Sequence, residues 1–125
     1  MAAVDKIGIT ARLLQRFKAA IAFYPYCFGG GDYDLPTLIL LGEADEWGPL
    51  NQCQELKAQS QNSGASIELI AYPGAFHAFD VPELQQGLSL EGPYGKTYWL
   101  QYDKQAHEDA AERVKSFLAE HLSLQ

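Results

Sequence analysis

Residues 37–42 read Thr37-Leu38-Ile39-Leu40-Leu41-Gly42, and they carry the strongest strand signal in the chain. A short apolar run that stops at a glycine is typical of a strand buried on both faces. Strands of this kind belong to parallel sheets that helices cover on both sides. The stretch therefore predicts an α/β fold.

Similar apolar runs lie on either side of this stretch. Residues 19–24 form a continuous apolar run that ends at Pro25, and residues 66–72 form another. A fourth, shorter strand is predicted at residues 7–10. Together these runs predict about four strands.

Segments with helical periodicity lie between and after the predicted strands. We expect helices at residues 11–18, from near Pro49 to the polar run 59–64, and after Asp103, which can cap the last helix. Because strands and helices alternate, the strands should pair in parallel through right-handed crossovers. The prediction is a three-layer α/β fold with about four mostly parallel strands and flanking helices. Residues 73–102 show no sustained period and predict a long irregular excursion.

Size and charge limit the classes of function. The chain has 125 residues, of which 47% are hydrophobic and 20% charged, so we expect one domain over residues 1–125. Nine basic residues against sixteen acidic ones give a net charge of −7, and the basic residues form no dense patch. Nucleic acids and anionic membranes are therefore not expected as partners. No signal peptide or membrane span is evident, which predicts a cytoplasmic location.

The two cysteines form no metal pattern. Cys27 and Cys53 lie far apart, and neither has a second cysteine or a histidine at ligand spacing. We expect no metal or other cofactor. Two buried free thiols are the favoured interpretation, because a reducing cytosol disfavours a disulfide between them, which is the alternative.

Two polar loops follow the strands predicted at 37–41 and 66–72. They read Gly42-Glu43-Ala44-Asp45-Glu46-Trp47-Gly48-Pro49 and Tyr72-Pro73-Gly74-Ala75-Phe76-His77-Ala78-Phe79-Asp80. Functional groups of open α/β sheets gather at the carboxyl ends of strands, so Asp45 and His77 could meet there. An acid that orients a histidine base is half of a catalytic triad. Alternatively, Asp45 only caps the following helix and His77 lies in a turn.

Both loops resemble the acid loop and the histidine loop of the dienelactone hydrolase family, a branch of the α/β-hydrolase fold. The similarity includes residues 20–27, which resemble the strand after the nucleophile, and residues 102–118, which resemble the last helix. It covers most of this chain but only the C-terminal half of the family. The resemblance implies a carboxylic ester or lactone hydrolase with Asp45 as triad acid and His77 as general base.

The nucleophile of that family has no clear counterpart here. The family carries a Cys or Ser in a Gly-x-(Cys/Ser)-x-Gly-Gly elbow between a strand and a helix. Cys27 lies in the nearest imitation, Pro25-Tyr26-Cys27-Phe28-Gly29-Gly30, but the residues after it cannot form the required helix. A better match places the elbow after residues 4–10, where this chain is shorter than the family. Cys27 remains a candidate nucleophile, and the prediction is weak or no hydrolysis by the chain alone.

The remaining expectations concern ligands and partners. Aromatic side chains of the two loops could line a pocket for a small ester or lactone, and the candidates are Trp47, Phe76 and Phe79. Tyr24 and Tyr26 are further candidates. A half-sheet leaves an edge strand uncovered, so a homodimer is the expected partner state. A non-catalytic binding or self-associating module is the alternative function, and a nucleophile supplied by another chain is a third.

Overall fold

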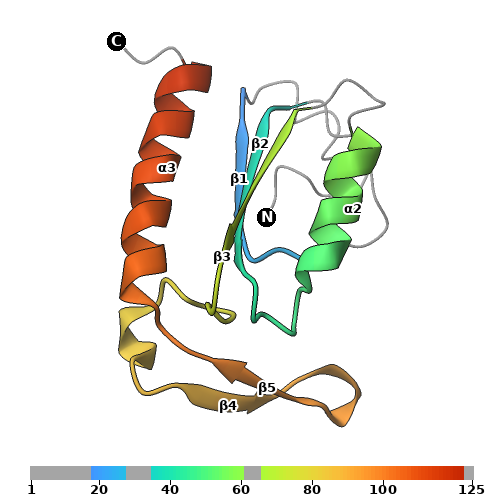
Figure 1. The fold of residues 1–125 in the computed structure, drawn as a ribbon, viewed down its shortest axis with the longest axis vertical. Helices are drawn as coiled ribbons and strands as arrows, with labels where there is room; N and C mark the ends of the chain where they lie inside the picture. The colour runs from blue at the N-terminus through green and yellow to red at the C-terminus, as the bar shows by residue number, and fades with distance from the viewer. Residues whose placement is uncertain (1–17, 28–34, 61–65, 123–125) are drawn as a thin grey trace.

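The computed structural model describes residues 18–27, 35–60 and 66–122. These residues form a parallel sheet, two longer helices and a separate antiparallel hairpin (Figure 1). In chain order the elements are β1 (Ala20–Phe23), β2 (Thr37–Gly42), α2 (Leu50–Ser60), β3 (Ile67–Tyr72), the 3-10 turn η2 (Pro82–Leu84), β4 (Leu88–Glu91), the 3-10 turn η3 (Pro93–Gly95), β5 (Thr97–Leu100) and α3 (Lys104–Leu122).

The parallel sheet has the order β1-β2-β3, with β2 in its centre. Every residue of β2 is buried, as the apolar run predicts for a strand covered on both faces. The pairing aligns Phe23 with Leu40 and Leu40 with Ile70, so the three carboxyl ends lie at the same edge. The expected parallel α/β architecture is confirmed, although the strand predicted at residues 7–10 lies outside the described residues.

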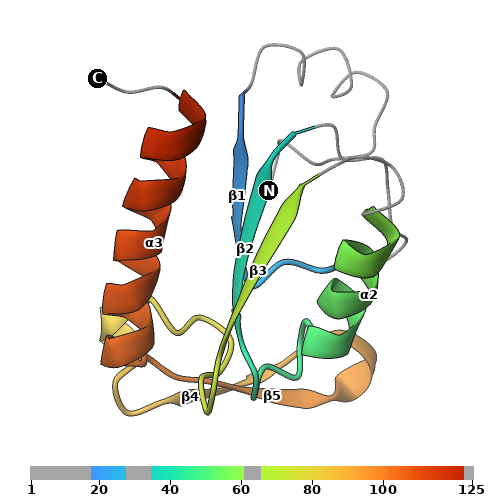
Figure 2. The same cartoon turned by 45° about the horizontal axis from the view of Figure 1, so that its top comes forward.

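Helices cover the two faces of the sheet, which makes three layers (Figures 1 and 2). On one face, Ala110 and Phe117 of α3 pack against Leu38 and Leu40 of β2. On the other face, Cys53 and Leu56 of α2 pack against alternate residues of the same strand, Ile39 and Leu41. The predicted N-cap of α3 is also confirmed, because Asp103 Oδ1 accepts a hydrogen bond from the Ala106 N–H at 3.1 Å.

The prediction of an irregular excursion over residues 73–102 is wrong in part. The hairpin β4–β5 lies within it and crosses below the carboxyl ends of the sheet strands in Figure 1. Its signal was weak because each strand has only four residues and all four of β4 are exposed. Two alternating apolar positions, Leu88 and Leu90, are too few to establish a period of two.

The expectation of two free thiols is also wrong. The structure contains a disulfide between Cys27 and Cys53. The packing of α2 on the sheet places Cys53 next to the segment that follows β1, with 5.0 Å between the two Cα atoms. That separation suits a disulfide. Because sequence separation says little about spatial separation, the pairing could not be predicted from the two positions alone.

A polar cluster ties α3 to the end of β3. The Tyr72 hydroxyl donates to Asp109 Oδ2 at 2.8 Å, and Arg113 Nε donates to the same oxygen at 3.1 Å. These two bonds hold the pKa of Asp109 below its ordinary value.

In the described part of the chain, no helix is long and apolar enough to cross a membrane.

Candidate active site

The two loops predicted to meet do so at the carboxyl ends of β2 and β3. The Glu43 N–H donates to the Tyr72 carbonyl at 2.9 Å, and the Ala44 N–H donates to the Ala75 carbonyl at 3.0 Å. The contact requires glycine at position 42, since a Cβ there would lie only 2.0 Å from the Ala75 carbonyl oxygen. Main-chain bonds and one glycine therefore bring the acid loop against the histidine loop.

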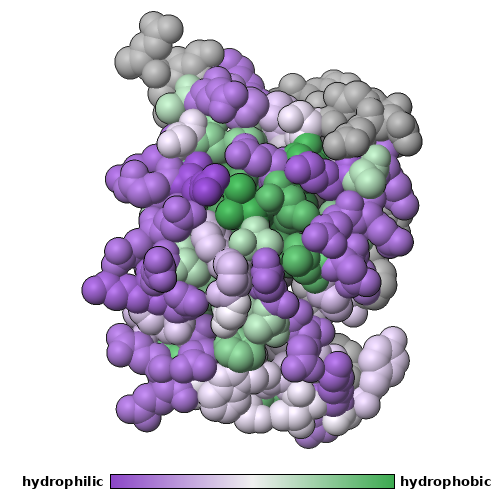
Figure 3. All heavy atoms as spheres, in the orientation of Figure 1, coloured by the Kyte–Doolittle hydropathy of each residue, from purple (hydrophilic) through white to green (hydrophobic). Residues whose placement is uncertain are grey.

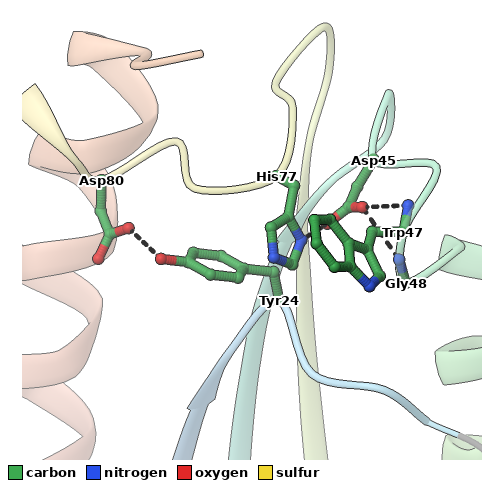
Figure 4. A network of polar contacts seen from close by, with 6 residues as sticks. All are labelled: Tyr24, Asp45, Trp47, Gly48, His77 and Asp80. Carbon is green, nitrogen blue, oxygen red and sulfur yellow. Dashed lines mark hydrogen bonds and ion pairs between the residues drawn. The ribbon is translucent and has the colours of Figure 1, made fainter. Parts of the chain in front are cut away.

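Asp45 is buried and fully hydrogen-bonded. Its Oδ1 accepts the N–H groups of Trp47 at 2.8 Å and Gly48 at 3.0 Å, bonds that are drawn in Figure 4. Its Oδ2 lies 2.9 Å from His77 Nδ1. The alternative that Asp45 caps the following helix is not supported, because the N–H groups of Trp47 and Gly48 precede the start of α2 at Leu50. Oδ1 organises the loop before the helix instead. The other oxygen holds His77.

The bond to Asp45 fixes the proton on the imidazole. A carboxylate oxygen can only accept a hydrogen bond, so Nδ1 of His77 must be the N–H donor. In neutral imidazole the other nitrogen, Nε2, then carries the lone pair, which is the arrangement of a general base. The His77 side chain retains 19% exposure, so a small molecule can reach it.

Aromatic rings enclose the imidazole on two sides. The Tyr24 ring lies edge-on with its centroid 4.4 Å from that of His77, and the Trp47 indole stacks at 5.1 Å with an interplanar angle of 26°. Figure 4 shows His77 between these two rings. Trp47 stacks in turn on Tyr98 of the hairpin at 4.9 Å. The hairpin therefore supports the imidazole through Trp47.

An open groove of about 590 Å³ leads to His77 along β1. Its lining residues are Ile21, Ala22, Phe23, Tyr24, Pro25, Tyr26 and His77. Most lining residues have apolar side chains, but polar atoms make up slightly more of the lined surface than apolar atoms. In the described part of the chain, the lining contains no serine and no cysteine. The groove suits a small organic ligand that has both polar and apolar groups, with its reactive group at the imidazole.

The other predicted site residues lie elsewhere. Cys27 is bonded to Cys53 in the cluster beneath α2, so in this state it has no thiol to act as a nucleophile. Phe79 is 0% exposed and belongs to the core, while Phe76 is half-buried and does not line the groove. Trp47 contacts the imidazole but also lies outside the groove lining. Among the described residues, the groove next to His77 is lined by β1 and the segment after it, and by none of Trp47, Phe76 and Phe79.

Two further residues belong to the site: Tyr24, which the sequence indicated only as a further candidate for the pocket, and Tyr98, which it did not indicate. Tyr24 contacts His77, and its hydroxyl donates to Asp80 Oδ1 at 2.7 Å. Functional groups of open α/β sheets gather at the carboxyl ends of the strands, and this rule predicted that Asp45 lies beside His77. It also applies to Tyr24, because Tyr24 directly follows the parallel strand β1 at the same edge of the sheet. Tyr98 had no such signal, since it comes from the hairpin that was expected to be irregular.

The described residues hold no group of three histidine, cysteine, aspartate or glutamate side chains that could bind a metal ion. The arrangement around His77 is a carboxylate, an imidazole and an open groove with both polar and apolar atoms. Such a site can accept and return a proton next to a bound organic molecule.

Comparison with known proteins identifies the family. The family model that describes sequences of the dienelactone hydrolase family matches residues 7–122 of this chain. The fold is similar to that of a protein assigned as a dienelactone hydrolase from Klebsiella pneumoniae, with a TM-score of 0.60 at 21% identity over 82% of this chain and 42% of that one. It is also similar to Thermogutta terrifontis esterase 2 phosphoramylated by tabun, with a TM-score of 0.60 at 19% identity over 88% of this chain and 44% of that one.

No curated protein matches the chain significantly. The chain spans less than half the length of the two solved structures it resembles. At these identities the two structures establish the fold alone, whereas the family match extends over nearly all of the sequence. The chain belongs to the dienelactone hydrolase family.

Proposed function

We propose that this chain carries the acid and base of a carboxylic ester or lactone hydrolase, with His77 as general base and Asp45 as the acid that orients it. The 2.9 Å contact between His77 Nδ1 and Asp45 Oδ2 carries the proposal. It sets the imidazole tautomer, and the partial exposure of His77 leaves the base accessible. The groove that ends at the imidazole exposes both polar and apolar atoms, which suits an ester or lactone.

The proposed reaction uses water as the attacking group. His77 Nε2 takes a proton from water as the water oxygen bonds to the carbonyl carbon of the ester. The tetrahedral intermediate then collapses, the bond to the leaving oxygen breaks, and His77 returns the proton to that oxygen. Water is chosen because the groove lining, as far as the chain is described, offers no serine and no free thiol.

Tyr24 is not proposed as the nucleophile. Its hydroxyl is committed to Asp80. Burial, together with that bond, raises the pKa of Tyr24 well above its ordinary value, so the hydroxyl keeps its proton. A neutral phenol is a poor nucleophile, which leaves the imidazole as the reactive group of the groove.

The test is hydrolysis of a small activated ester, p-nitrophenyl acetate, by the purified chain. We expect His77→Ala to lower the rate above background about tenfold, a modest loss because water is a weaker nucleophile than an activated side chain. His107→Ala is the matched control, since His107 is also a half-buried histidine and its Nδ1 lies 3.0 Å from the Tyr102 hydroxyl. Equal rates for wild type and His77→Ala would contradict the proposal.

Self-association is a second candidate function, supported by the outer edge of β3. Among the described residues no strand pairs with this edge, and Ser66 and Tyr72 direct their carbonyls toward β2. By the period of two, the main-chain groups of Ile67, Leu69 and Ala71 then face outward. Figure 3 shows apolar side chains gathered over β3 between the two helices. Apart from the exposed Glu68, the residues of β3 are apolar or aromatic, and an open strand edge can pair with its own copy about a two-fold axis.

For this candidate we expect the chain to be a dimer by native mass spectrometry at micromolar concentration. Ala71→Lys should shift the mass to that of a monomer, because Ala71 lies on the outward-facing edge outside the hydrophobic clusters and a charge there opposes pairing. Tyr94→Lys adds the same charge at the fully exposed hairpin tip and should leave the mass unchanged. A monomeric wild type would eliminate self-association and leave the hydrolase proposal intact.

A further inference from the structure

The Tyr24 side chain links the end of β1 to the histidine loop. Its hydroxyl donates to Asp80 Oδ1 at 2.7 Å, and its main-chain N–H donates to the Leu40 carbonyl at 2.7 Å. Asp80 is three residues after His77 in the same loop. Both ends of Tyr24 are therefore fixed, one by the central strand and one by the loop that carries the imidazole.

The fixed Tyr24 ring limits where the imidazole can lie. Asp45 holds only the Nδ1 edge of His77, and a single hydrogen bond permits the ring to swing about it. Tyr24 at 4.4 Å and Trp47 at 5.1 Å bound the imidazole on its other sides (Figure 4). The two aromatic contacts therefore restrict the orientation that the carboxylate alone leaves open.

The main chain at this point supports the same conclusion. Tyr24 has φ 39° and Ala78, next to His77, has φ 63°. Residues with a Cβ rarely adopt such positive φ values, and they persist where the surrounding contacts determine them. Tyr24 keeps this conformation while its hydroxyl reaches Asp80 and its ring reaches His77, which is the pattern expected at a functional site.

We propose that Tyr24 and Asp80 form a positioning pair that holds the His77 imidazole in the orientation needed for catalysis. The pair acts on the imidazole through the Tyr24 ring, which also lines the groove, and Tyr24→Phe keeps that ring in the lining. The pair's role in catalysis rests on the proposed function, whereas its effect on the imidazole does not. Loss of the Tyr24–Asp80 bond frees the Tyr24 ring, and the imidazole then samples orientations in which Asp45 no longer holds Nδ1.

The experiment compares imidazole NMR spectra and ester hydrolysis for three variants. Tyr24→Phe removes only the hydroxyl, Asp80→Ala removes the acceptor, and Asp80→Asn keeps an acceptor oxygen. Long-range proton–nitrogen spectra report which nitrogen of His77 carries the proton. We expect one tautomer, with the proton on Nδ1, in wild type and Asp80→Asn, and a mixture of tautomers in Tyr24→Phe and Asp80→Ala. In Tyr24→Phe and Asp80→Ala, kcat for ester hydrolysis should fall about fivefold, and KM should change less than twofold.

Tyr72→Phe is the matched control. It removes another tyrosine–carboxylate bond of similar length, 2.8 Å to Asp109, from a cluster that does not include His77. It should lower the thermal midpoint about as much as Tyr24→Phe and leave the His77 spectrum unchanged. An unaltered His77 spectrum in folded Tyr24→Phe would overturn the inference. The same change in Asp80→Asn as in Asp80→Ala would also overturn it, since the hydrogen bond would then not be the cause.

The two readouts separate this inference from the proposed function. If the wild type hydrolyses no ester, the proposed function fails, and the NMR comparison still decides whether Tyr24 and Asp80 hold His77. If the wild type hydrolyses the ester but the variants keep the His77 spectrum and kcat, only the positioning role fails.

Discussion

Asp45→Ala should lower the free energy of unfolding by about 3 kcal/mol, because the change leaves hydrogen-bond donors in or near the interior without their acceptor. The N–H groups of Trp47 and Gly48 and the Nδ1–H group of His77 all donate to this side chain, which is 0% exposed. Each lost partner costs about 1 kcal/mol or more. Urea unfolding followed by circular dichroism measures the difference.

Asp45→Asn is the control for this prediction, and the geometry dictates how the amide must lie. Two N–H groups point at the Oδ1 position, so the amide oxygen occupies it and the NH₂ group faces His77. The imidazole must then accept at Nδ1 and carry its proton on Nε2, where a base needs a lone pair. We expect near wild-type stability in this variant, with ester hydrolysis reduced to the level of His77→Ala. A loss below about 1 kcal/mol in Asp45→Ala would contradict the burial argument.

Gly42→Ala should lower the free energy of unfolding by about 2–4 kcal/mol, because a methyl group at this position overlaps main-chain atoms. The added Cβ would lie 2.0 Å from the oxygen and 2.4 Å from the carbon of the Ala75 carbonyl. Backbone atoms cannot move aside as a flexible side chain can, so the two loops must separate. The molecules that fold should also hydrolyse ester more slowly, since Asp45 and His77 lie on the separated loops.

Gly74→Ala provides the comparison for the glycine effect. Position 74 has φ +74° and no atom within 4 Å of the added Cβ, so only conformational strain of about 1 kcal/mol is expected. Unfolding in urea should place Gly42→Ala well below Gly74→Ala in stability. Equal midpoints for the two variants would mean that the loops separate without significant cost.

The parallel sheet and the pairing of Asp45 with His77 could be predicted because they depend on local patterns and one topological rule. Runs such as 37–42 identify buried strands, and parallel neighbours place their following loops together. The disulfide depends on how α2 packs, and the hairpin depends on two strands with weak alternation. Neither leaves a distinct trace in the sequence. The aromatic pattern of the loops does not separate core from lining: Phe79 is buried in the core, whereas the groove beside His77 follows β1 and includes Tyr24 and Tyr26.

Gly42 approaches Ala75 closely, so main-chain contacts between the two loops set the distance between the acid Asp45 and the base His77. The hydrogen bonds that join the loops use N–H and carbonyl groups, which every residue type except proline supplies in full. Side chains elsewhere in the two loops can therefore change over evolution without altering the distance between Asp45 and His77. Divergence should act mainly on the groove and the rings around the imidazole, and thus on which ligand is accepted.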